Sequence, residues 1–293
     1  MTKTVIVTGA NSGLGFETTK QIAAKGSNYQ LVMACRNMKK AAVARQRILQ
    51  TIPDANIICL ELDTSSLAKV RAFVAAFRKL NIPLYGLVCN AGVSGKTVHQ
   101  TQDGFNNIFE TNYLGHFLLT QLLMPLMEVK GRIVTVSSER HDALLKGATW
   151  PGSNVLAYSG MNPQVDGQSY PFSKLCMILF AYELDQKLRA NGQQIAVNSV
   201  NPGLMTETGL AKDKSRFTPT VLSQFAGIIG TAKDSGKMIT DLITADKFAA
   251  GPVRYFDRSS DKPVLSSNLS YDEQIQDELW NFSMEAVGLK GNE

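Results

Sequence analysis

The sequence has few cysteines, and none of them are clustered. Cys35, Cys59, Cys89 and Cys176 lie far apart in the 293 residues, and none forms a CxxC pair. Zinc sites and disulfide frameworks are built from cysteines at closer, recurring spacings. The three histidines, of which His116 is interpreted as structural, also lack the spacing of metal ligands. We therefore expect free thiols in a reducing compartment and no metal site.

Long apolar runs and blocks of like charge are also missing. No stretch of 18 apolar residues occurs, and the first apolar run starts at Val5, which leaves no room for a signal peptide. The net charge is +5, but the basic residues are dispersed, which disfavours nucleic acid as a partner. The composition predicts a cytoplasmic protein without a transmembrane segment, whose charge suits a phosphate-bearing small molecule.

Short apolar runs alternate with helical patterns along most of the chain. The runs are nearly continuously apolar, which is typical of parallel strands covered on both faces. Repeated strand–helix units predict an α/β fold: one domain over residues 1–293, with a Rossmann-type doubly wound parallel sheet and helices on both faces. The predicted strands are 4–8, 29–35, 56–62, 84–90, 131–138 and 195–200, with 251–257 as a candidate seventh. The predicted helices run from the first glycines to about residue 25 and over 38–51, 66–80, 103–127 and 170–190.

Two long segments, 139–169 and 204–232, interrupt this alternation. Long loops at the carboxyl ends of parallel strands usually form the site, so we expect substrate loops here. Their apolar residues would wall a lipophilic pocket, although the second set fits the buried face of a helix equally well. These residues are Trp150, Val155, Leu156 and Tyr158 in the first segment, and Phe217, Val221, Leu222, Phe225, Ile228 and Ile229 in the second.

A glycine-rich stretch, TGANSGLG at 8–15, follows the first predicted strand. Glycine allows a tight turn and lets a pyrophosphate approach the N–H groups at the start of the next helix. The strand before it and the helix after it are the context that a dinucleotide site requires. The predicted cofactor contacts in this stretch are Gly9, Asn11, Ser12, Gly13, Leu14 and Gly15.

The second predicted strand ends in ACRN, which bears on the choice of cofactor. An acidic residue here would bind the ribose 2′-hydroxyl of NAD, whereas arginine accommodates the 2′-phosphate of NADP. Arg36 therefore indicates NADP(H), with Asn37 and either Lys39 or Lys40 as helpers. Asp63, after the third strand, is placed either to contact the adenine or to cap the next helix.

A tyrosine and a lysine stand four residues apart in SYPFSKLC, at 169–176. Residues four apart lie on the same face of a helix, and Pro171 suits a first helical position. A helix beginning near Tyr170 would place its phenol beside the Lys174 ammonium. A nearby positive charge favours the phenolate, so the pair predicts a proton donor that works near neutral pH.

Five ordered motifs together resemble the short-chain dehydrogenase/reductases. They are TGxxxGxG at 8–15, CNAG at 89–92, Asn112 within TNYLGHFLLT, the serine pair that ends the fifth strand, and YxxxK at 170–174. The resemblance covers nearly the whole chain, and motifs in this order and context are specific.

The resemblance implies a role for each of these residues. Tyr170 would be the general acid/base, and Lys174 would hold the nicotinamide ribose and lower the pKa of the phenol. Ser138, rather than Ser137, would bond the substrate oxygen. Asn112 would complete a proton relay through water to Lys174. The residues implied to line the cofactor at the fourth strand are Asn90, Ala91 and Gly92.

Longer strings are similar to light-dependent protochlorophyllide reductases and related retinol-dehydrogenase-like enzymes. They are MACRN at 33–37, VCNAG at 88–92, YPFSKLC at 170–176, PGLMTETGL at 202–210 and DELWNFSMEAVGL at 277–289. The similarity implies cofactor contacts from Pro202 and Gly203, and a carboxamide contact from Thr208 or Thr206.

The chain departs from the protochlorophyllide enzymes at three positions. Leu204 replaces a cysteine expected after PG, Ser138 stands where those enzymes usually have threonine, and Pro171 follows the tyrosine. These departures put the photochemical ring reduction in doubt, but not the hydride chemistry.

The function we expect is NADPH-dependent reduction of a bulky, apolar carbonyl compound, or oxidation of the corresponding alcohol. The alternatives are C=C reduction in a tetrapyrrole and, from another class, a sensor that binds NADP(H) without turnover. The sequence encodes neither the substrate nor the direction of the reaction. It also leaves open whether the chain forms a homo-oligomer.

Overall fold

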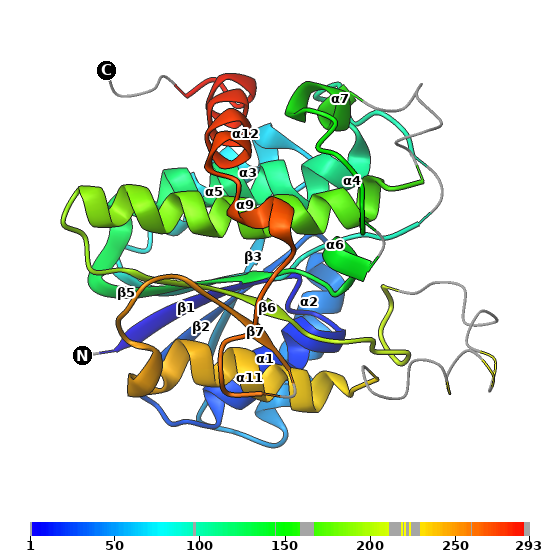
Figure 1. Ribbon diagram of the computed structural model, residues 1–293. Helices are drawn as coiled ribbons and strands as arrows, with labels where there is room; N and C mark the ends of the chain where they lie inside the picture. Colours follow the sequence, from blue (N-terminus) through cyan, green and yellow to red (C-terminus); the bar gives the residue numbers. More distant parts are fainter. Residues whose placement is uncertain are drawn as a thin grey trace.

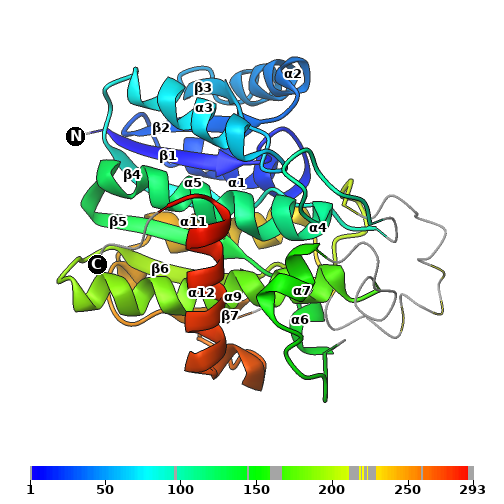
Figure 2. The same cartoon turned by 90° about the horizontal axis from the view of Figure 1, so that it is seen from above.

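A seven-stranded, all-parallel sheet lies at the centre of the molecule, with the strand order β3-β2-β1-β4-β5-β6-β7 (Figures 1 and 2). The structure is a computed structural model, which describes residues 2–95, 98–143, 145–158, 167–210, 218, 220, 223, 229–258 and 260–289. The strands are β1 (Lys3–Thr8), β2 (Tyr29–Cys35), β3 (Asn56–Glu61), β4 (Leu84–Cys89), β5 (Met127–Val136), β6 (Ala196–Asn201) and β7 (Arg254–Asp257).

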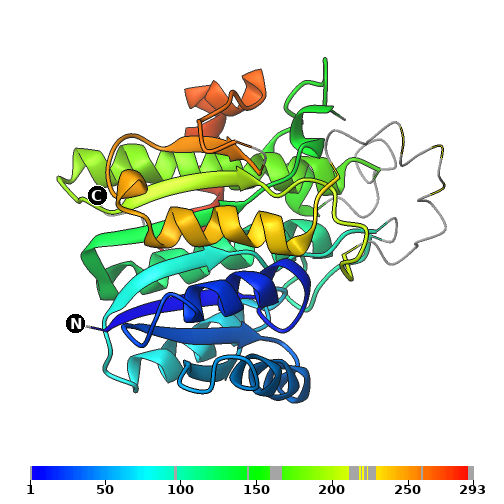
Figure 3. The ribbon, with the colours of Figure 1, turned by 90° about the horizontal axis from the view of Figure 1, so that it is seen from below.

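Helices cover both faces of the sheet. One face carries α1 (Gly13–Ala23), α2 (Met38–Leu49) and α11 (Ala232–Thr244), which Figure 3 shows from below. The other carries α3 (Leu67–Arg78), α5 (Gly115–Leu123) and α9 (Ser169–Ala190), with α12 (Glu273–Ala286) and α7 (Ser153–Tyr158) packed outside them (Figure 1). This arrangement confirms the predicted doubly wound α/β fold.

Each face of the sheet has its own apolar core. Successive strand side chains point to opposite faces, so Ile6 joins the core under α9 while Val5 and Val7 join the core under α1 and α11. Both sets are fully buried, which explains why the strands read as continuous apolar runs. The central strands are thereby held rigidly, with their carboxyl ends at one edge.

Most predicted strands lie within a residue or two of their positions, but the fifth differs. It spans Met127–Val136 rather than 131–138, and its pairing with β4 shifts register between Leu84 and Gly86. The early part of β5 is half-buried or exposed and is not an apolar run, so apolarity alone did not reveal it. Ser137 and Ser138 therefore follow the strand instead of ending it.

The predicted helix over 103–127 begins later and is not uniform. Asn106 accepts hydrogen bonds from the N–H groups of Ile108 and Phe109 and starts α4 (Asn107–Phe109). A π-helical turn, η1 (Glu110–Leu114), follows, then α5 and a 3₁₀ turn, η2 (Met124–Leu126). Asn112 sits inside the π-helical turn, a feature that often marks functional positions.

Helix α9 begins at Ser169, so Pro171 is its third residue rather than its first. The first four N–H groups of a helix have no intrahelical partner, and proline is tolerated anywhere among them. The proline also leaves Tyr170 within the helix, although the residue before a proline is biased away from helical backbone.

Several elements in and after the two interrupting segments had no counterpart in the predictions. Short helices α6 (Arg140–Ala143) and α7 lie in the first segment, and α11 begins where the second ends. Near the carboxyl end come η4 (Asp246–Phe248), η5 (Asn268–Tyr271) and α12, which packs across α9 (Figure 2).

Two predictions from composition can be compared with the structure. All four cysteines are free, and three of them are buried. In the described part of the chain, every helix is too short or too polar to cross a membrane.

Candidate active site

The glycine-rich stretch forms the turn between β1 and α1. Gly9 donates its N–H to the Ala34 carbonyl at 2.8 Å, which joins the turn to β2. A methyl group placed on Gly15 would lie 2.5 Å from the Gly9 carbonyl oxygen and 2.6 Å from the Asn90 amide nitrogen. No side chain fits there, so the start of α1 packs directly against the turn and against Asn90.

The start of α1 faces the same turn. Ser12 is the N-cap residue, with extended backbone, but its side chain makes no capping hydrogen bond. The first N–H groups of the helix are therefore left to bind an anion, for which a helix amino terminus is suited by its dipole. This geometry fits the pyrophosphate of a dinucleotide.

Arg36 lies at the carboxyl end of β2 and is largely exposed. Its Nε is 3.9 Å from a carboxylate oxygen of Asp63, with 68% of the arginine side chain open to solvent. Asn37 accepts the Lys40 N–H at 2.9 Å and caps α2, so its side chain has a structural partner. Lys39 and Lys40 are both exposed beside it.

Asp63 does not cap α3, because Ser66 is the N-cap residue and its hydroxyl accepts the N–H of Lys69. One carboxylate oxygen accepts the N–H of Ser65 at 3.0 Å and its hydroxyl at 2.6 Å, just before α3. The other faces Arg36. The residue thus shapes the start of α3 while holding a carboxylate at the edge where the adenine end of a dinucleotide would lie.

Thr8 joins the ends of β1 and β4. Its hydroxyl oxygen accepts the main-chain N–H groups of Asn90 and Ala91, both at 2.8 Å, and the Asn90 side chain donates to the Thr8 carbonyl at 2.7 Å. These bonds hold residues 90–92 against the glycine turn. Thr8 was read only as the first residue of the glycine motif, because its partners lie more than 80 residues away.

Asn112 links the π-helical turn to α9. Its amide exchanges two hydrogen bonds with the main chain of Val93, at 2.7 and 3.0 Å, and donates to the Ser173 hydroxyl at 2.9 Å. Ser173 in turn donates to the Tyr170 carbonyl at 2.8 Å. Asn112 therefore fixes the start of α9 through Ser173, the residue directly before Lys174.

Lys174 is buried under the same edge of the sheet. Its ammonium group donates to the Val136 carbonyl at 2.9 Å and lies 5.8 Å from the centre of the Tyr170 ring. Burial lowers the pKa of Lys174 to about 8. A methyl group on Gly92 would come within 3.7 Å of the ammonium and 3.2 Å of the Asn112 oxygen, so Gly92 leaves room between them.

Ser138 and Tyr170 complete the cluster. Burial raises the pKa of Tyr170 to about 12, while a hydrogen bond between its side chain and Ser138 acts in the opposite direction. The predicted depression of this pKa is therefore absent here, because the loss of solvation around the phenol dominates. Ser138 also donates to Glu139 at 3.3 Å, whereas Ser137 donates to the Lys174 carbonyl and supports α9.

The turn after β6 brings in the remaining predicted contacts. Asn201 accepts the N–H groups of Gly203 and Glu139, at 2.9 and 3.1 Å, and so ties this turn to the chain beyond β5. Pro202 accepts the Ser235 hydroxyl at 2.6 Å. Asn201 carried no signal in the sequence beyond its place before PG.

Of the two threonines in this turn, Thr208 lies nearer the glycine turn. Thr208 is buried, and a methyl group placed on Gly13 would lie 3.2 Å from the methyl carbon of Thr208. Thr206 is half-buried, with no such proximity to the glycines recorded.

Taken together, the predicted residues meet at the carboxyl ends of β1, β2, β4, β5 and β6. The cradle of glycines, the uncapped start of α1 and the buried Lys174 ammonium fit a nicotinamide dinucleotide. These groups would hold the cofactor; Ser138 and Tyr170 would face the reacting atoms.

The two predicted substrate segments are described only in part. In the first, Trp150 and Ser153 donate to the Glu278 carboxylate of α12, at 2.8–3.0 Å, and Leu156 is buried. Val155 and Tyr158 are exposed. In the second, Phe217, Val221, Leu222, Phe225 and Ile228 lie outside the described residues, and Ile229 forms a bridge with Leu204.

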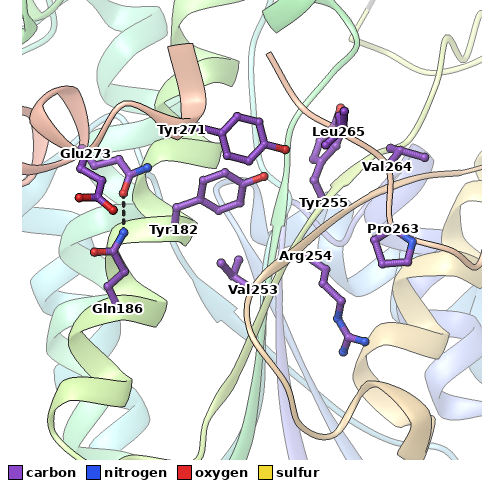
Figure 4. A pocket seen from close by; sticks show the side chains of 11 residues that line it. Tyr182, Gln186, Val253, Arg254, Tyr255, Pro263, Val264, Leu265, Tyr271 and Glu273 are labelled. Carbon is purple, nitrogen blue, oxygen red and sulfur yellow. Dashed lines mark hydrogen bonds between the residues drawn. The ribbon is translucent and has the colours of Figure 1, made fainter. Parts of the chain in front are cut away.

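A separate cavity of about 370 Å³ lies between α9, β7 and the segment before α12 (Figure 4). Tyr182, Tyr255 and Tyr271 line it together with Val264 and Leu265, and none of the predicted site residues does. It is therefore distinct from the cluster around Tyr170. Within the described part of the chain, no three acidic, histidine or cysteine side chains are grouped as metal ligands.

Comparisons with known proteins identify the family. The family model described as short chain dehydrogenase matches residues 3–149. The chain is 34% identical to short-chain dehydrogenase TIC 32 B, chloroplastic, of Brassica napus, over 97% of this chain and 88% of that one. It is 32% identical to human retinol dehydrogenase 13, over 98% and 85%. The chain belongs to the short-chain dehydrogenase family and is an oxidoreductase by family.

A solved structure supports the fold over the full length. A protein from Mycobacterium paratuberculosis superposes with a TM-score of 0.75 at 27% identity, covering 99% of this chain and 95% of that one. The likeness extends past residue 149, so it includes the helix that carries Tyr170 and Lys174.

Proposed function

We propose that the protein is an NADP(H)-dependent oxidoreductase that interconverts a carbonyl group and an alcohol on a bulky, apolar substrate. The observation that carries the proposal is the position of Tyr170, whose ring centre lies 5.8 Å from the buried Lys174 ammonium and whose side chain interacts with Ser138. An acid/base group, a hydrogen-bond donor for the substrate oxygen and a fixed cation are what such a reaction requires.

The chemistry divides between cofactor and protein. When bound, the nicotinamide supplies or accepts the hydride. With a pKa of about 12, Tyr170 keeps its proton at neutral pH and can give it to a carbonyl oxygen that gains negative charge. Ser138 would hold that oxygen by a hydrogen bond, and the same two groups would act in reverse when an alcohol is oxidised.

Lys174 supports both partners. Its ammonium group lies beside the Tyr170 ring, where positive charge stabilises developing phenolate, and it would also bond the nicotinamide ribose. Asn112 holds this arrangement through Ser173 and Val93. A protein that only sensed NADP(H) would have no use for Ser138 and Tyr170 together.

The choice of NADP(H) over NAD(H) rests on Arg36. Its exposed guanidinium group stands at the end of β2, where a 2′-phosphate would lie, and arginine binds phosphate through paired N–H groups. We expect Arg36→Asp to weaken NADPH binding by about tenfold or more, since it replaces attraction with repulsion. Titration of both cofactors checks this; an unchanged preference would contradict the role of Arg36.

An apolar substrate is supported by one relative, since retinol dehydrogenase 13 is named for an apolar alcohol. We also propose a cytoplasmic location, because all four cysteines are free thiols. Fractionation of cells that express the tagged protein tests the location.

The function is tested by NADPH consumption at neutral pH, in darkness and under illumination, with aromatic ketones, retinal, steroids and protochlorophyllide. We expect dark turnover of an aldehyde or ketone. Tyr170→Phe should lower it by a factor of roughly 10² to 10⁴ while NADPH still binds. Tyr29→Phe is the matched control, because Tyr29 is the first residue of β2 and so lies at the opposite end of the strand from the site.

Other results would point to the alternative functions. Product formed only in the light, and only from protochlorophyllide, would favour ring reduction. NADPH binding with no turnover of any substrate would favour a sensor.

A further inference from the structure

Two of the three histidines are buried beside the catalytic residues. His116 is fully buried in α5, and His141 is 2% exposed in α6, while His99 is exposed. A buried imidazole that makes no contribution to a site is usually satisfied by nearby polar groups. In this structure one partner of each ring is the main-chain carbonyl of a residue proposed to act in catalysis, Asn112 for His116 and Ser138 for His141.

His116 connects the cofactor turn with the π-helical turn. Its Nδ1 lies 3.0 Å from the Asn112 carbonyl oxygen, and its Nε2 lies 2.9 Å from the Thr8 hydroxyl. A carbonyl only accepts, so Nδ1 must carry the proton. Nε2 then accepts from Thr8, whose oxygen already accepts from Asn90 and Ala91. One chain of hydrogen bonds thus runs from the end of β4 to Asn112.

His141 repeats this arrangement at Ser138. Its Nδ1 lies 2.5 Å from the Ser138 carbonyl oxygen, and its Nε2 accepts the N–H of Ser267 at 3.2 Å. Again the proton must be on Nδ1. The ring also packs edge-on against Tyr255, with centres 5.2 Å apart. Ser138 is thereby tied to the segment that precedes α12.

Both rings are uncharged at neutral pH. Burial lowers the pKa of His116 to about 4, and burial also lowers the pKa of His141. Each neutral ring therefore has one donor and one acceptor, which its two partners use fully. If His141 were charged, its Nε2 would also carry a proton. This second donor would then face the main-chain N–H of Ser267, which is itself a donor.

Asn112 lies where the main-chain hydrogen bonds of the helix are irregular. In a regular α-helix, the Asn112 carbonyl would be held by the main-chain N–H of residue 116. In a π-helical turn, hydrogen bonds span five residues instead, as the bond from Gly115 to Glu110 shows. The imidazole of residue 116 provides a donor for the Asn112 carbonyl at this irregular point.

We propose that His116 and His141 are positioning residues for the reaction, each holding the main chain of a catalytic residue through a neutral imidazole protonated on Nδ1. His116 fixes Asn112 relative to the cofactor turn, and His141 fixes Ser138 relative to the carboxyl-terminal segment. The inference rests on the proposed function for its catalytic consequence, but the state of the two rings can be measured without any substrate.

The first measurement is the tautomer of each ring. Long-range ¹H–¹⁵N spectra of the full chain, ¹⁵N-labelled at histidine and recorded from pH 6 to 8, distinguish a proton on Nδ1 from one on Nε2. We expect His116 and His141 to be neutral and protonated on Nδ1 throughout, with assignment by the single variants and His99 as the exposed reference. A proton on Nε2 in either ring, or a charged ring, would overturn the proposal for that residue.

The second measurement separates positioning from general stability. His116→Leu and His141→Leu remove both hydrogen bonds, whereas His116→Asn and His141→Asn keep a donor near the position of Nδ1. We expect the leucine variants to lose about tenfold or more in kcat for NADPH oxidation with retinal, because small displacements of catalytic groups are costly. The KM for NADPH should change much less, and the asparagine variants should recover part of kcat.

His99→Leu is the matched control and should behave as the wild type. Folded leucine variants with wild-type kcat would contradict the proposal. If they do not fold, the tautomers decide: a proton on Nδ1 in both rings supports the proposal, and a proton on Nε2 refutes it. A wild type that oxidises no NADPH with any compound of the screen would contradict the proposed function, whereas the tautomers would still judge the geometry.

Discussion

Glycines on the cofactor side of the site leave no space for a side chain, whereas glycines on the substrate side do. On the cofactor side, a methyl group on Gly15 would collide with the Gly9 carbonyl, and one on Gly115 with the Thr64 carbonyl. On the substrate side, methyl groups on Gly167 and Gly209 would meet nothing within 4 Å. Backbone contacts thus set the shape of the cofactor side, while the described part of the substrate side has space for other side chains.

The same contrast holds for the bonds that fix each side. Thr8, Asn90 and Asn112 hold the cofactor side through buried main-chain groups. The first substrate segment is held mainly by one carboxylate, Glu278, which accepts from Trp150 and Ser153 in a partly exposed position. The difference indicates one fixed subsite for a constant ligand and one that can vary with little effect on the fold.

The largest effect is expected at Lys174, the buried cation on the fixed side. Its pKa is lowered from 10.5 to about 8, so between these values the unfolded chain binds the extra proton. Stability should therefore rise with pH over this window, by about 1.4 kcal/mol per pH unit and about 3 kcal/mol in all, relative to Lys174→Met.

Urea unfolding of the wild type and Lys174→Met at pH 7, 8, 9 and 10 measures this difference. Below about pH 8 the two curves should run parallel, because both states of the wild type are then protonated at this residue. Parallel curves at every pH would show that the ammonium is better solvated than its position implies.

The next effect is expected at Gly15. Gly15→Ala forces a methyl group against the Gly9 carbonyl and the Asn90 side chain, and overpacking of this kind costs about 2 kcal/mol. We expect weaker NADPH binding, by roughly thirtyfold if the whole cost falls on the bound state. Fluorescence titration measures it, with Gly209→Ala as the control in open space; equal effects at both positions would remove the contrast between the two sides.

The smallest effect is expected on the substrate side. Glu278→Ala removes the acceptor for three hydrogen bonds, but in a partly exposed place, so we expect a loss of about 1 kcal/mol in unfolding free energy. The KM for the carbonyl substrate should rise while NADPH affinity is unchanged. Glu285→Ala, on the exposed face of the same helix, is the control. A comparable loss of NADPH affinity would show that the two sides are coupled.

Local patterns in the sequence were sufficient for most of the fold. The strand over 29–35 lies at its predicted residues, since a buried parallel strand is a bounded apolar run. The π-helical turn was not predictable, because one inserted residue barely alters helical periodicity. The segment that forms α12 contributed only to the family resemblance. That this helix covers α9 was not predicted, because the contact depends on packing between distant segments.

The site residues also divide into those that local sequence patterns predict and those that they do not. Glycines, Arg36 and the Tyr170–Lys174 pair are recognisable because short spacing relates them to one strand or helix end. Thr8 and Asn201 were missed because their roles depend on partners from other elements: the Thr8–His116 contact joins residues 108 positions apart. The pKa of Tyr170 was also beyond the sequence, since burial decides it.

The order of strands in the sheet has a consequence for the growing polypeptide. The sheet extends outward from β1, first through β2 and β3, then on the other side through β4, β5, β6 and β7 in turn. From β4 onward, each newly synthesised strand finds its neighbour already in place, so pairing can follow the order of synthesis. Helix α12, which is synthesised after β7, then closes over α9, and its Trp280 ring stacks on Phe180. A chain stopped before residue 273 would therefore keep the residues of the site, but α9, which carries Tyr170 and Lys174, would lose this cover on its outer face.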